Sequence, residues 1–374
     1  MRLLGQPPAS PGMTLSEVDT PALIVELAAL DRNIRRLPAA IAKAPVRIRP
    51  HAKSHKCPQI ARLQIAAGAV GVCCQKVSEA EALVAGGISD IFVSNEIVGV
   101  RKLQALAELA ARAQVSVCAD DAGNVSDIAA AADRAGSTLT LFVEIDVGSR
   151  RCGVPPGSAA VDLARCILSY PRLRFGGLQA YHGPAQHVRD VAQRRAAATA
   201  AAESARLTKE LLLSNGIECA VITGGGTGTF EFDAASGVYD EIQPGSYVFM
   251  DADYARNEWA GGEPDFQQSL FVWTTVMSRP DRSIGSVDAG IKSLSNDSGP
   301  PQVRGRPDIE YVRGADEHGV LRFNLAERAP RLGEKLMLVP GHCDPTVNLH
   351  DWIVGVRDGI VEAVWPVAAR GAIH

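Results

Sequence analysis

Apolar and polar positions between residues 46 and 249 repeat one pattern: a short β-rich run is followed by an Ala-rich run with apolar residues at helical spacing. We expect eight strands, at residues 46–52, 71–75, 90–95, 114–120, 139–146, 175–181, 219–224 and 239–249. Strands that alternate with helices pair in parallel, and eight such units favour a closed (β/α)8 barrel, a TIM-like α/β fold. An open doubly wound sheet is the alternative arrangement of the same units.

The intervening stretches, such as residues 78–86, 98–113 and 189–215, predict the helices. Gly or Asn often ends these stretches, which is usual at the C-terminus of a helix. Ser78 and Glu81 have the spacing of a capping box, so we expect the first of these helices to begin there.

After about residue 250 the pattern changes to alternating and β-branched runs without helical spacing. Residues 269–278, 282–288, 335–340 and 352–367 predict the strands of a mostly antiparallel C-terminal β domain. We therefore expect three parts, which are a loose N-terminal tail at residues 1–17, a barrel at 18–255 and the β domain at 256–374.

Composition and charge narrow the class of protein. Of the 374 residues, 46% are hydrophobic and 21% are charged, as in a globular protein with a full core. No apolar run is long enough for a membrane span, and the N-terminus breaks into Pro and Gly instead of forming a signal peptide. A net charge of −4 gives no reason to expect nucleic acid or a membrane as a partner. Eight cysteines without a CxxC pair indicate free thiols and a cytoplasmic location.

Polar and glycine-rich residues follow most of the expected barrel strands. In chain order they are His51 to Lys56, Gln75, Asn95, Asp146 to Gly153, Gln179 to Gly183, Thr223 to Gly228 and Gln243 to Tyr247. Catalytic groups of such barrels gather at the C-terminal ends of the strands, so these residues predict one active face.

The glycine run at residues 223–228 is a candidate for binding. Its backbone N–H groups can hold a phosphate, and Thr227 can add a hydroxyl. The same glycines are equally typical of a tight strand–helix turn, where they serve packing alone. The run matches neither the Walker spacing nor the dinucleotide fingerprint.

Lys53 lies at the end of the first expected barrel strand, beside His51, His55 and Lys56. Cationic neighbours and burial lower the pKa of a lysine toward the neutral amine. A neutral lysine opposite a phosphate-binding turn is what a Schiff base to pyridoxal phosphate (PLP) requires. A solvated basic patch is the alternative.

A third candidate lies in the expected β domain. In an extended chain residues i and i+2 share a face, so His342 and Asp344 would point one way and Cys343 the other. An imidazole and a carboxylate on one face suit a divalent ion that keeps several waters. A simple His–Asp hydrogen bond, or a zinc half-site that includes Cys343, are the alternatives.

These segments together resemble the D-threonine aldolase and D-serine dehydratase family, within the alanine-racemase-like (fold type III) PLP enzymes. The resemblance runs from about residue 18 to residue 371. It rests on Asp19-Thr20-Pro21, RPHAKSHK (49–56), GVCCQKVSEAE (71–81), IDVGSRRCGV (145–154), QAYHG (179–183), TGGGTG (223–228), IQPGSYVFMD (242–251) and PGHCDPTVNLHD (340–351). RPHAKSHK and HCDPTVN are the most specific of these motifs.

The resemblance implies a PLP-binding barrel, a β domain that carries a metal site, and a homodimer. It implies Lys53 as the Schiff-base lysine and Tyr181 as a catalytic residue beside the cofactor, with Arg151 or Gln243 at the pyridine nitrogen. The other residues implied to bind the cofactor are Gln75, Thr223, Gly225, Gly226, Thr227, Gly245 and Ser246.

The resemblance also implies that His342 and Asp344 bind a divalent ion near the β-hydroxyl of the substrate. The dehydratase branch has a cysteine where this chain has Asp344. The harder carboxylate favours Mn²⁺, with Mg²⁺ or Co²⁺ next, over Zn²⁺. Cys343, in the middle position, leaves a register slip toward the dehydratase pattern open.

The implied reaction is the retro-aldol cleavage of D-threonine and other D-β-hydroxy-α-amino acids to glycine and an aldehyde. His187 is the expected base for the β-hydroxyl proton; His182, water, or a structural role for either histidine are the alternatives. A dehydratase acting on D-serine or D-3-hydroxyaspartate is the second hypothesis, in which Lys53 removes the Cα proton. The His342–Asp344 pair argues against a racemase and against a non-catalytic PLP carrier.

Overall fold

A computed structural model describes residues 5–262 and 265–374, and the chain divides into two compact units. The first, here called the β unit, comprises the residues up to Arg36, Ser54–Cys57 and Ser246–Gly371. The second, the barrel unit, comprises Leu37–Lys53, Pro58–Gly245 and Ala372–His374. Segments that are distant in sequence therefore build each unit.

The barrel unit is a curled sheet of eight parallel strands in the order β2-β9-β8-β7-β6-β5-β4-β3. The strands are β2 (Arg47–Ile48), β3 (Val72–Cys74), β4 (Asp90–Glu96), β5 (Gln114–Ala119), β6 (Leu139–Glu144), β7 (Leu173–Ala180), β8 (Val221–Gly224) and β9 (Glu241–Ile242). An isolated parallel bridge from His51, just after β2, to Cys73 in β3 joins the two ends of this order. The eight expected strands are confirmed, and they form the curled parallel sheet that was expected of a TIM-like barrel.

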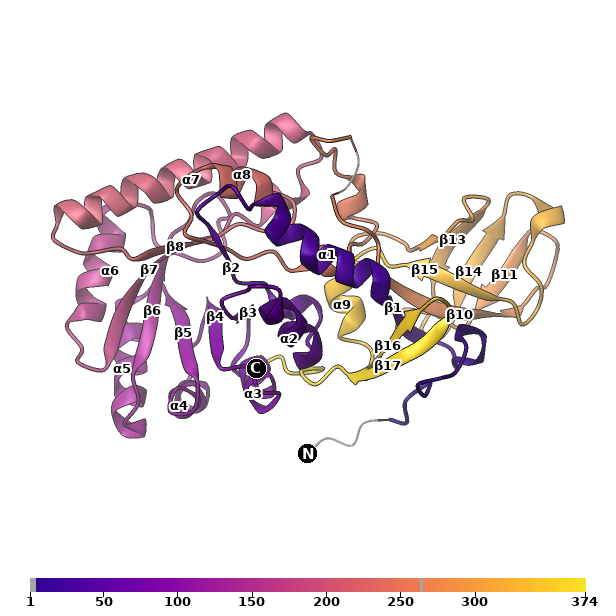
Figure 1. The fold of residues 1–374 in the computed structure, drawn as a ribbon, viewed down its shortest axis with the longest axis horizontal. Coiled ribbons are helices and arrows are strands. Elements are labelled where there is room, and N and C mark those ends of the chain that lie inside the picture. Colours follow the sequence, from indigo (N-terminus) through magenta and orange to yellow (C-terminus); the bar gives the residue numbers. More distant parts are fainter. Residues whose placement is uncertain (1–4, 263–264) are drawn as a thin grey trace. The chain divides into compact units, whose positions relative to one another are not determined.

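Helices connect these strands, and Figure 1 shows α5, α6 and α7 along the outer side of the curled sheet. The helices are α1 (Leu27–Ala40), α2 (Pro58–Ala66), α3 (Val77–Ala85), α4 (Val100–Leu109), α5 (Ala122–Ala135), α6 (Ser158–Leu168), α7 (Val191–Ser214) and α8 (Phe230–Ala235). Asp121 and Asp190 cap α5 and α7, because their carboxylates accept the backbone N–H of Asn124 at 2.8 Å and of Gln193 at 2.7 Å.

The start of α3 differs from the expected capping box. The helix begins at Val77, so Ser78 is already inside its first turn. The Glu79 carboxylate accepts the backbone N–H of Gln75 at 2.8 Å and of Lys76 at 3.2 Å. An acidic residue in the first turn thus satisfies two backbone donors, and the prediction that Ser78 and Glu81 cap the helix is wrong.

Arg49 connects the first residues of two strands inside the barrel unit. Its guanidinium donates to Glu241 of β9 at 2.8 Å and to Asp90 of β4 at 2.6 Å. Glu241 is buried, and its second oxygen pairs with Arg47 at 3.1 Å. A buried carboxylate is stable only when it is paired. Arg49 therefore stabilises the ionised Glu241 at its buried position in β9.

The β unit contains a nine-stranded sheet in the order β11-β14-β13-β12-β15-β10-β1-β16-β17. Its strands are β1 (Ala22–Glu26), β10 (Leu270–Ser278), β11 (Ile284–Val287), β12 (Gln302–Val303), β13 (Ile309–Gly314), β14 (Gly319–Phe323), β15 (Lys335–Val339), β16 (Trp352–Arg357) and β17 (Ile360–Pro366). Neighbouring strands pair antiparallel except β1 and β16, which pair in parallel. The expected antiparallel domain is present.

Strand β1 joins this sheet although it precedes the barrel strands in sequence. It lies between β10 and β16, and its residues Ala22–Val25 are buried. The β unit therefore begins near the N-terminus, which differs from the expected bounds of 18–255 and 256–374.

The N-terminal segment from residue 9 to residue 15 packs against the hairpin of β16 and β17. The N–H of Gly12 donates to the carbonyl of Val361 at 2.9 Å, and the N–H of Val361 donates to Met13 at 2.8 Å. Ala9 is buried in the core cluster around Phe271, with Met13 packed beside it. This part of the expected loose tail is therefore held in place.

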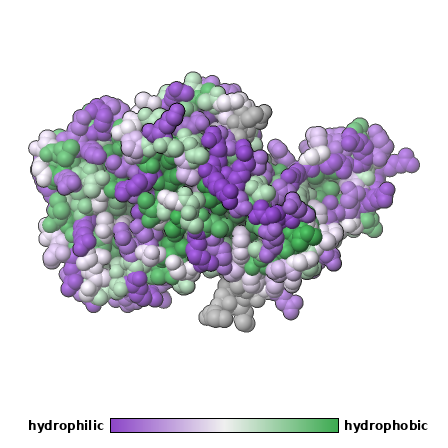
Figure 2. All heavy atoms as spheres, viewed as in Figure 1, coloured by the Kyte–Doolittle hydropathy of each residue, from purple (hydrophilic) through white to green (hydrophobic). Residues whose placement is uncertain are grey.

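The surface is mixed in character. Figure 2 shows hydrophilic residues gathered over the strands β11, β13 and β14 of the β unit. Within the described ranges, no helix combines the length and hydropathy of a bilayer span.

All eight cysteines are free thiols, six of them buried, as expected from their spacing.

Candidate active site

Lys53 lies in a short 3-10 helix, Ala52–Ser54, that directly follows β2. Just before it, His51 Nε2 lies 2.8 Å from Gln75 Nε2 and 3.2 Å from Ser94 Oγ. Gln75 follows β3 and Ser94 is in β4, so the contacts join the C-terminal ends of three strands. Of the polar residues expected at the strand ends, His51 and Gln75 are therefore brought together here, and the half-buried Lys53 follows His51 by two residues.

The glycine turn after β8 is tightly packed. A Cβ on Gly225, whose φ is +70°, would lie 2.4 Å from Asp233 Oδ2, and one on Gly226 would lie 2.6 Å from Gln186 Oε1. The N–H of Gly228 donates to Gln186 Oε1 at 2.9 Å. A larger residue at Gly225 or Gly226 would therefore collide with these side chains, and the close packing fixes the path of the backbone through the turn.

Asp233 of α8 is a buried carboxyl behind this turn. It accepts the hydroxyl of Thr229 at 2.5 Å. Burial raises the pKa of Asp233 to about 7, while bonds from Thr229 and the backbone of Gly226 act in the opposite direction. No motif pointed to Asp233, and its only sequence signal is its place in the first helix after the glycine run.

Gln243 and Thr223 form a closed network across β7, β8 and the end of β9. Gln243 Nε2 donates to Gln179 Oε1 at 2.8 Å and to Thr223 Oγ1 at 2.7 Å. Gln179 returns a bond to Gln243 Oε1 at 3.3 Å. Both amide protons of Gln243 are therefore used by protein oxygens, as in a structural residue.

Arg151 and Tyr181 lie together at the ends of β6 and β7. The Arg151 guanidinium is 5.6 Å from the centre of the Tyr181 ring, and its Nη2 is 3.7 Å from Glu144 Oε1. Burial, with the Glu96 carboxylate as the next cause, raises the pKa of Glu144 to about 8, and Arg151 opposes this shift. Arg151 is thus held between a buried carboxyl and an aromatic face.

The two histidines after β7 differ in their surroundings. The Nδ1 atom of His182 accepts the backbone N–H of Ala185 at 3.3 Å, and burial lowers the pKa of His182 against a weaker opposing effect of Asp146. His187 ends the 3-10 helix Pro184–His187 and is exposed. A structural role therefore fits the half-buried His182, whose ring is bonded to the backbone.

In the β unit, residues 342–344 are not extended as the spacing argument assumed. His342 has an extended backbone, with φ −145°, but it is the N-cap of helix α9 (Cys343–Val347). The thiol of Cys343 points to Asp344 Oδ1 at 3.3 Å. The prediction that Cys343 faces away from Asp344 is wrong, because the chain turns into a helix between the first and second residue.

Two further carboxylates hold this segment. Asp251, which is fully buried, accepts the backbone N–H of Cys343 at 2.9 Å, and Asp297 Oδ2 lies 2.7 Å from His342 Nδ1. Burial alone would lower the pKa of His342, but Asp344, Asp297 and Asp251 together raise it. Among the described residues, no set of three His, Cys, Asp or Glu side chains is spaced to hold an ion without other ligands.

Asp251 could have been found from the sequence, since it ends the motif at residues 242–251. Asp297 carried no such signal, because the loop at residues 295–298 lies 45 positions from His342 in sequence. The positions of Asp297, Asp233 and Glu144 near the expected site residues therefore become visible only in the folded structure.

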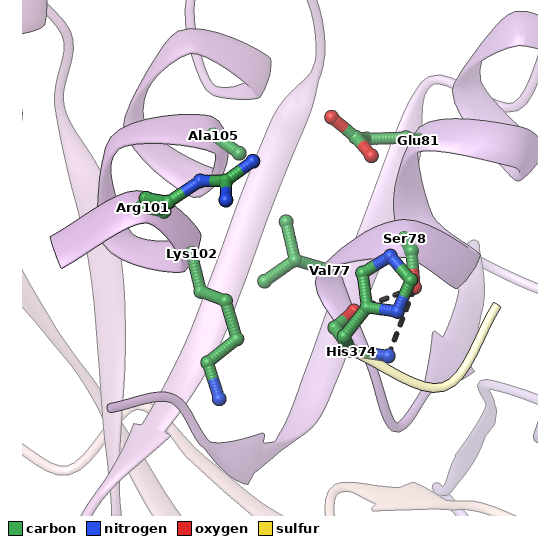
Figure 3. A pocket seen from close by; sticks show the side chains of 7 residues that line it. All are labelled: Val77, Ser78, Glu81, Arg101, Lys102, Ala105 and His374. Carbon is green, nitrogen blue, oxygen red and sulfur yellow. Dashed lines mark hydrogen bonds between the residues drawn. The ribbon is translucent and has the colours of Figure 1, made fainter. Parts of the chain in front are cut away.

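A hollow of about 570 Å³ in the barrel unit lies between the first turns of α3 and α4. Figure 3 shows Arg101 and Lys102 on one side and Glu81, Ser78 and His374 on the other. The backbone oxygen of His374 accepts the hydroxyl of Ser78 at 2.5 Å. None of the residues expected to bind cofactor, substrate or metal lines this hollow.

Comparison with known proteins identifies the relatives of this chain. Residues 25–253 match the family model of the alanine racemase N-terminal domain, and residues 269–356 match a serine dehydratase domain model. The chain is 50% identical to a D-threonine aldolase of an Arthrobacter species over 98% of this chain and 96% of that protein. It is 46% identical to a 3-hydroxy-D-aspartate aldolase of Paracoccus denitrificans over 97% of this chain and 95% of that protein. The crystal structure of D-threonine aldolase from Filomicrobium marinum superposes with a TM-score of 0.97 at 50% identity, covering 99% of this chain and 100% of that chain.

Proposed function

Because the chain belongs to the D-threonine aldolase family, we propose that it is a PLP- and divalent-metal-dependent lyase that cleaves D-threonine and other D-β-hydroxy-α-amino acids to glycine and an aldehyde. The observation that carries the proposal is the likeness to D-threonine aldolase over nearly the full chain. The His342–Asp344 pair, which has a carboxylate where the dehydratase branch has a cysteine, supports the aldolase over the dehydratase.

The barrel unit fits PLP by its chemistry. When bound, PLP supplies an electron sink for the bond that breaks at Cα. We assign its covalent attachment to Lys53, which follows β2 and stands beside the polar network of His51 and Gln75. The glycine turn is the segment we assign to its phosphate, although the N–H of Gly228 donates to Gln186 and the backbone of Gly226 bonds to Asp233. The residues assigned to the phosphate and its surroundings are Gln75, Thr223, Gly225, Gly226, Thr227, Gly245 and Ser246.

We assign the pyridine nitrogen to Arg151 and not to Gln243. Both amide protons of Gln243 are donated to Gln179 and Thr223, so none is left for a ligand. The Arg151 guanidinium instead has several N–H donors, and it lies near the Glu144 carboxyl and the Tyr181 ring. Tyr181 is then the aromatic residue beside the cofactor.

The donor set in the β unit suits a hard divalent ion, with Mn²⁺ as the first choice and Mg²⁺ or Co²⁺ as the next. An imidazole nitrogen from His342 and a carboxylate from Asp344 leave most of the coordination shell to water and substrate oxygens. When bound, such an ion lowers the pKa of the β-hydroxyl and stabilises the carbonyl oxygen that forms. The Cys343 thiol is a softer ligand than the Asp344 carboxylate and suits a hard divalent ion less well.

His187 is the residue we assign to the removal of the β-hydroxyl proton. His187 is exposed, whereas His182 is half-buried. A base has to be reachable by the substrate, and the greater exposure of His187 supports this assignment.

The products formed from D-threonine test the proposal. The protein loaded with PLP and Mn²⁺ should release glycine and acetaldehyde in equal amounts, and the Lys53→Ala variant should release neither. Release of ammonia and an oxo acid in place of glycine would assign the chain to the dehydratase reaction.

We propose in addition that the protein is a cytoplasmic homodimer. The family resemblance supports the dimer, and eight unpaired thiols support a reducing compartment. Sedimentation of the PLP-loaded protein should give twice the mass of the chain, and a monomeric mass would contradict the dimer.

A further inference from the structure

We propose that Asp297 is a positioning residue for the divalent ion, which it controls by fixing the proton and the orientation of the His342 ring. The inference rests on the proposed metal-dependent function, and it extends the site by a residue that no motif contains. Asp297 belongs to the loop between β11 and β12, whereas His342 precedes α9.

The contact between Asp297 and His342 is short, and neighbouring hydroxyls hold the carboxylate in place. Asp297 Oδ2 lies 2.7 Å from His342 Nδ1. The other carboxylate oxygen of Asp297 accepts the hydroxyl of Ser295 at 2.8 Å, and Ser298 Oγ donates to Oδ2 at 3.2 Å. Two hydroxyls therefore hold the carboxylate in the direction of the ring.

The chemistry of this pair determines which ring nitrogen can bind a metal. An ionised carboxylate only accepts hydrogen bonds, so the proton of the neutral imidazole must reside on Nδ1. The lone pair is then on Nε2, on the opposite side of the ring, where it can be donated to an ion. Carboxylate–histidine–metal arrangements of this kind orient the ring and raise the basicity of the ligand nitrogen.

The backbone around His342 is anchored independently of Asp297. Asp251 accepts the N–H groups of Cys343 and Tyr254, each at 2.9 Å. The hydroxyl of Thr346 donates to the carbonyl of His342 at 2.8 Å. Removal of the Asp297 carboxylate should therefore release the ring without unfolding the start of α9.

The affinity of the PLP-loaded protein for Mn²⁺, measured without substrate by the electron paramagnetic resonance signal of free Mn²⁺, tests the inference. We expect Asp297→Ala to weaken binding about 10- to 100-fold. Asp297→Asn, whose amide oxygen can still accept from Nδ1, should lose less. The matched control is Glu317→Gln, which removes one charge from an exposed pair with Lys292 and should bind Mn²⁺ as the parent does.

Further variants distinguish a wrong metal site from a wrong role for Asp297. His342→Ala should lose Mn²⁺ binding, and if it does not, the proposed metal site is itself wrong. If His342→Ala loses the ion while Asp297→Ala and Asp297→Asn bind it within twofold of the parent, only the role of Asp297 is wrong. A loss in Asp297→Ala that is accompanied by a melting temperature far below that of Glu317→Gln would mean that the substitution disturbs the fold, and it would also count against the positioning role.

Discussion

His182 and His187 follow the same strand, β7, but their local contacts give them different chemistry. The backbone N–H of Ala185 occupies a ring nitrogen of His182, and burial lowers the pKa of that ring. His187 is exposed at the end of its 3-10 helix. A sequence cannot separate two histidines that lie five residues apart, because their difference in burial arises only in the folded turn.

The first prediction concerns this pair. His187→Ala should lower kcat for D-threonine cleavage by about 10²- to 10⁴-fold, since that is the usual contribution of a general base. His182→Ala should lower it by much less. Steady-state kinetics of the two variants at one pH measure the difference. A larger loss in the His182 variant would reverse the assignment of the base.

Glu144 is a buried carboxyl at the end of β6. Burial, followed by the effect of Glu96, raises its pKa from an ordinary 4.5 to about 8 in the folded protein. Between these pH values the folded state holds a proton that the unfolded state has lost. Glu144 therefore makes the free energy of unfolding fall as the pH rises from 4.5 to 8.

Glu144→Gln should remove this dependence, because the amide does not titrate. Urea unfolding at pH 5 and pH 8 should show a smaller decrease for the variant than for the parent, by on the order of 1–3 kcal/mol. Glu310→Gln, which changes an exposed pair with Arg322, is the control and should retain the parent's decrease. An unchanged decrease in Glu144→Gln would show that the buried carboxyl is ionised throughout.

At the scale of the elements, the short strands β2 and β9 depend on charge pairing as well as on backbone bonds. Each is two residues long, and they pair in parallel. Arg49, directly after β2, joins Glu241 of β9 to Asp90 of β4. Side-chain ion pairs therefore stabilise the part of the barrel sheet where the strands are shortest.

Arg49→Leu should destabilise the protein by about 3 kcal/mol, since it leaves the buried Glu241 with only one ion-pair partner. Arg47→Leu, which removes the more exposed partner, should cost no more than about 1 kcal/mol. The urea midpoints of both variants measure these costs. Equal losses would mean that Arg49 contributes no more than a surface ion pair.

The repeated β–helix pattern predicted the eight barrel strands, because each βα unit leaves a local signal in its own 20 to 30 residues. Strand β1 gave no such signal of its place. Its residues Ala22–Glu26 form an apolar run, but its partners β10 and β16 lie hundreds of residues further along the chain. Pairing at that distance depends on the whole sheet and is absent from any window of sequence.

The segment at residues 342–344 shows the opposite case, a local signal that was misinterpreted. Asp344 and Pro345 are typical of the first turn of a helix, where an acidic residue meets the helix dipole and a proline lacks only an unused N–H. The pairing of His342 with Asp344 used the same assumption, so it now rests on the family resemblance alone. The predicted direction of Cys343 was wrong because it assumed a strand.

At the scale of the whole molecule, the motif at residues 49–56 is divided between the two units. Lys53 belongs to the barrel unit, whereas Ser54–Cys57 belong to the β unit. Lys56 has a left-handed backbone, with φ +51°, and its carbonyl accepts the N–H of Ala369 at 3.1 Å. The two lysines of this motif therefore serve different purposes, Lys53 in the proposed chemistry and Lys56 in the structure of the β unit.

The proposed reaction needs an ion held by His342 and Asp344 together with a lysine at the end of a barrel strand. With two protein ligands and an otherwise open shell, the ion should exchange readily. We expect only the D configuration at Cα to be accepted. Either configuration at the β-carbon should be accepted, because the ion would bind the hydroxyl and not the methyl group. Both D-threonine and D-allo-threonine should then be substrates.

Acetaldehyde release by the PLP-loaded protein, before and after dialysis against EDTA and after addition of Mn²⁺, is the most direct test. We predict that EDTA abolishes release from D-threonine, that Mn²⁺ restores it, and that L-threonine gives none under any of the three conditions. Full activity after exhaustive chelation, or equal rates with L-threonine, would contradict the account.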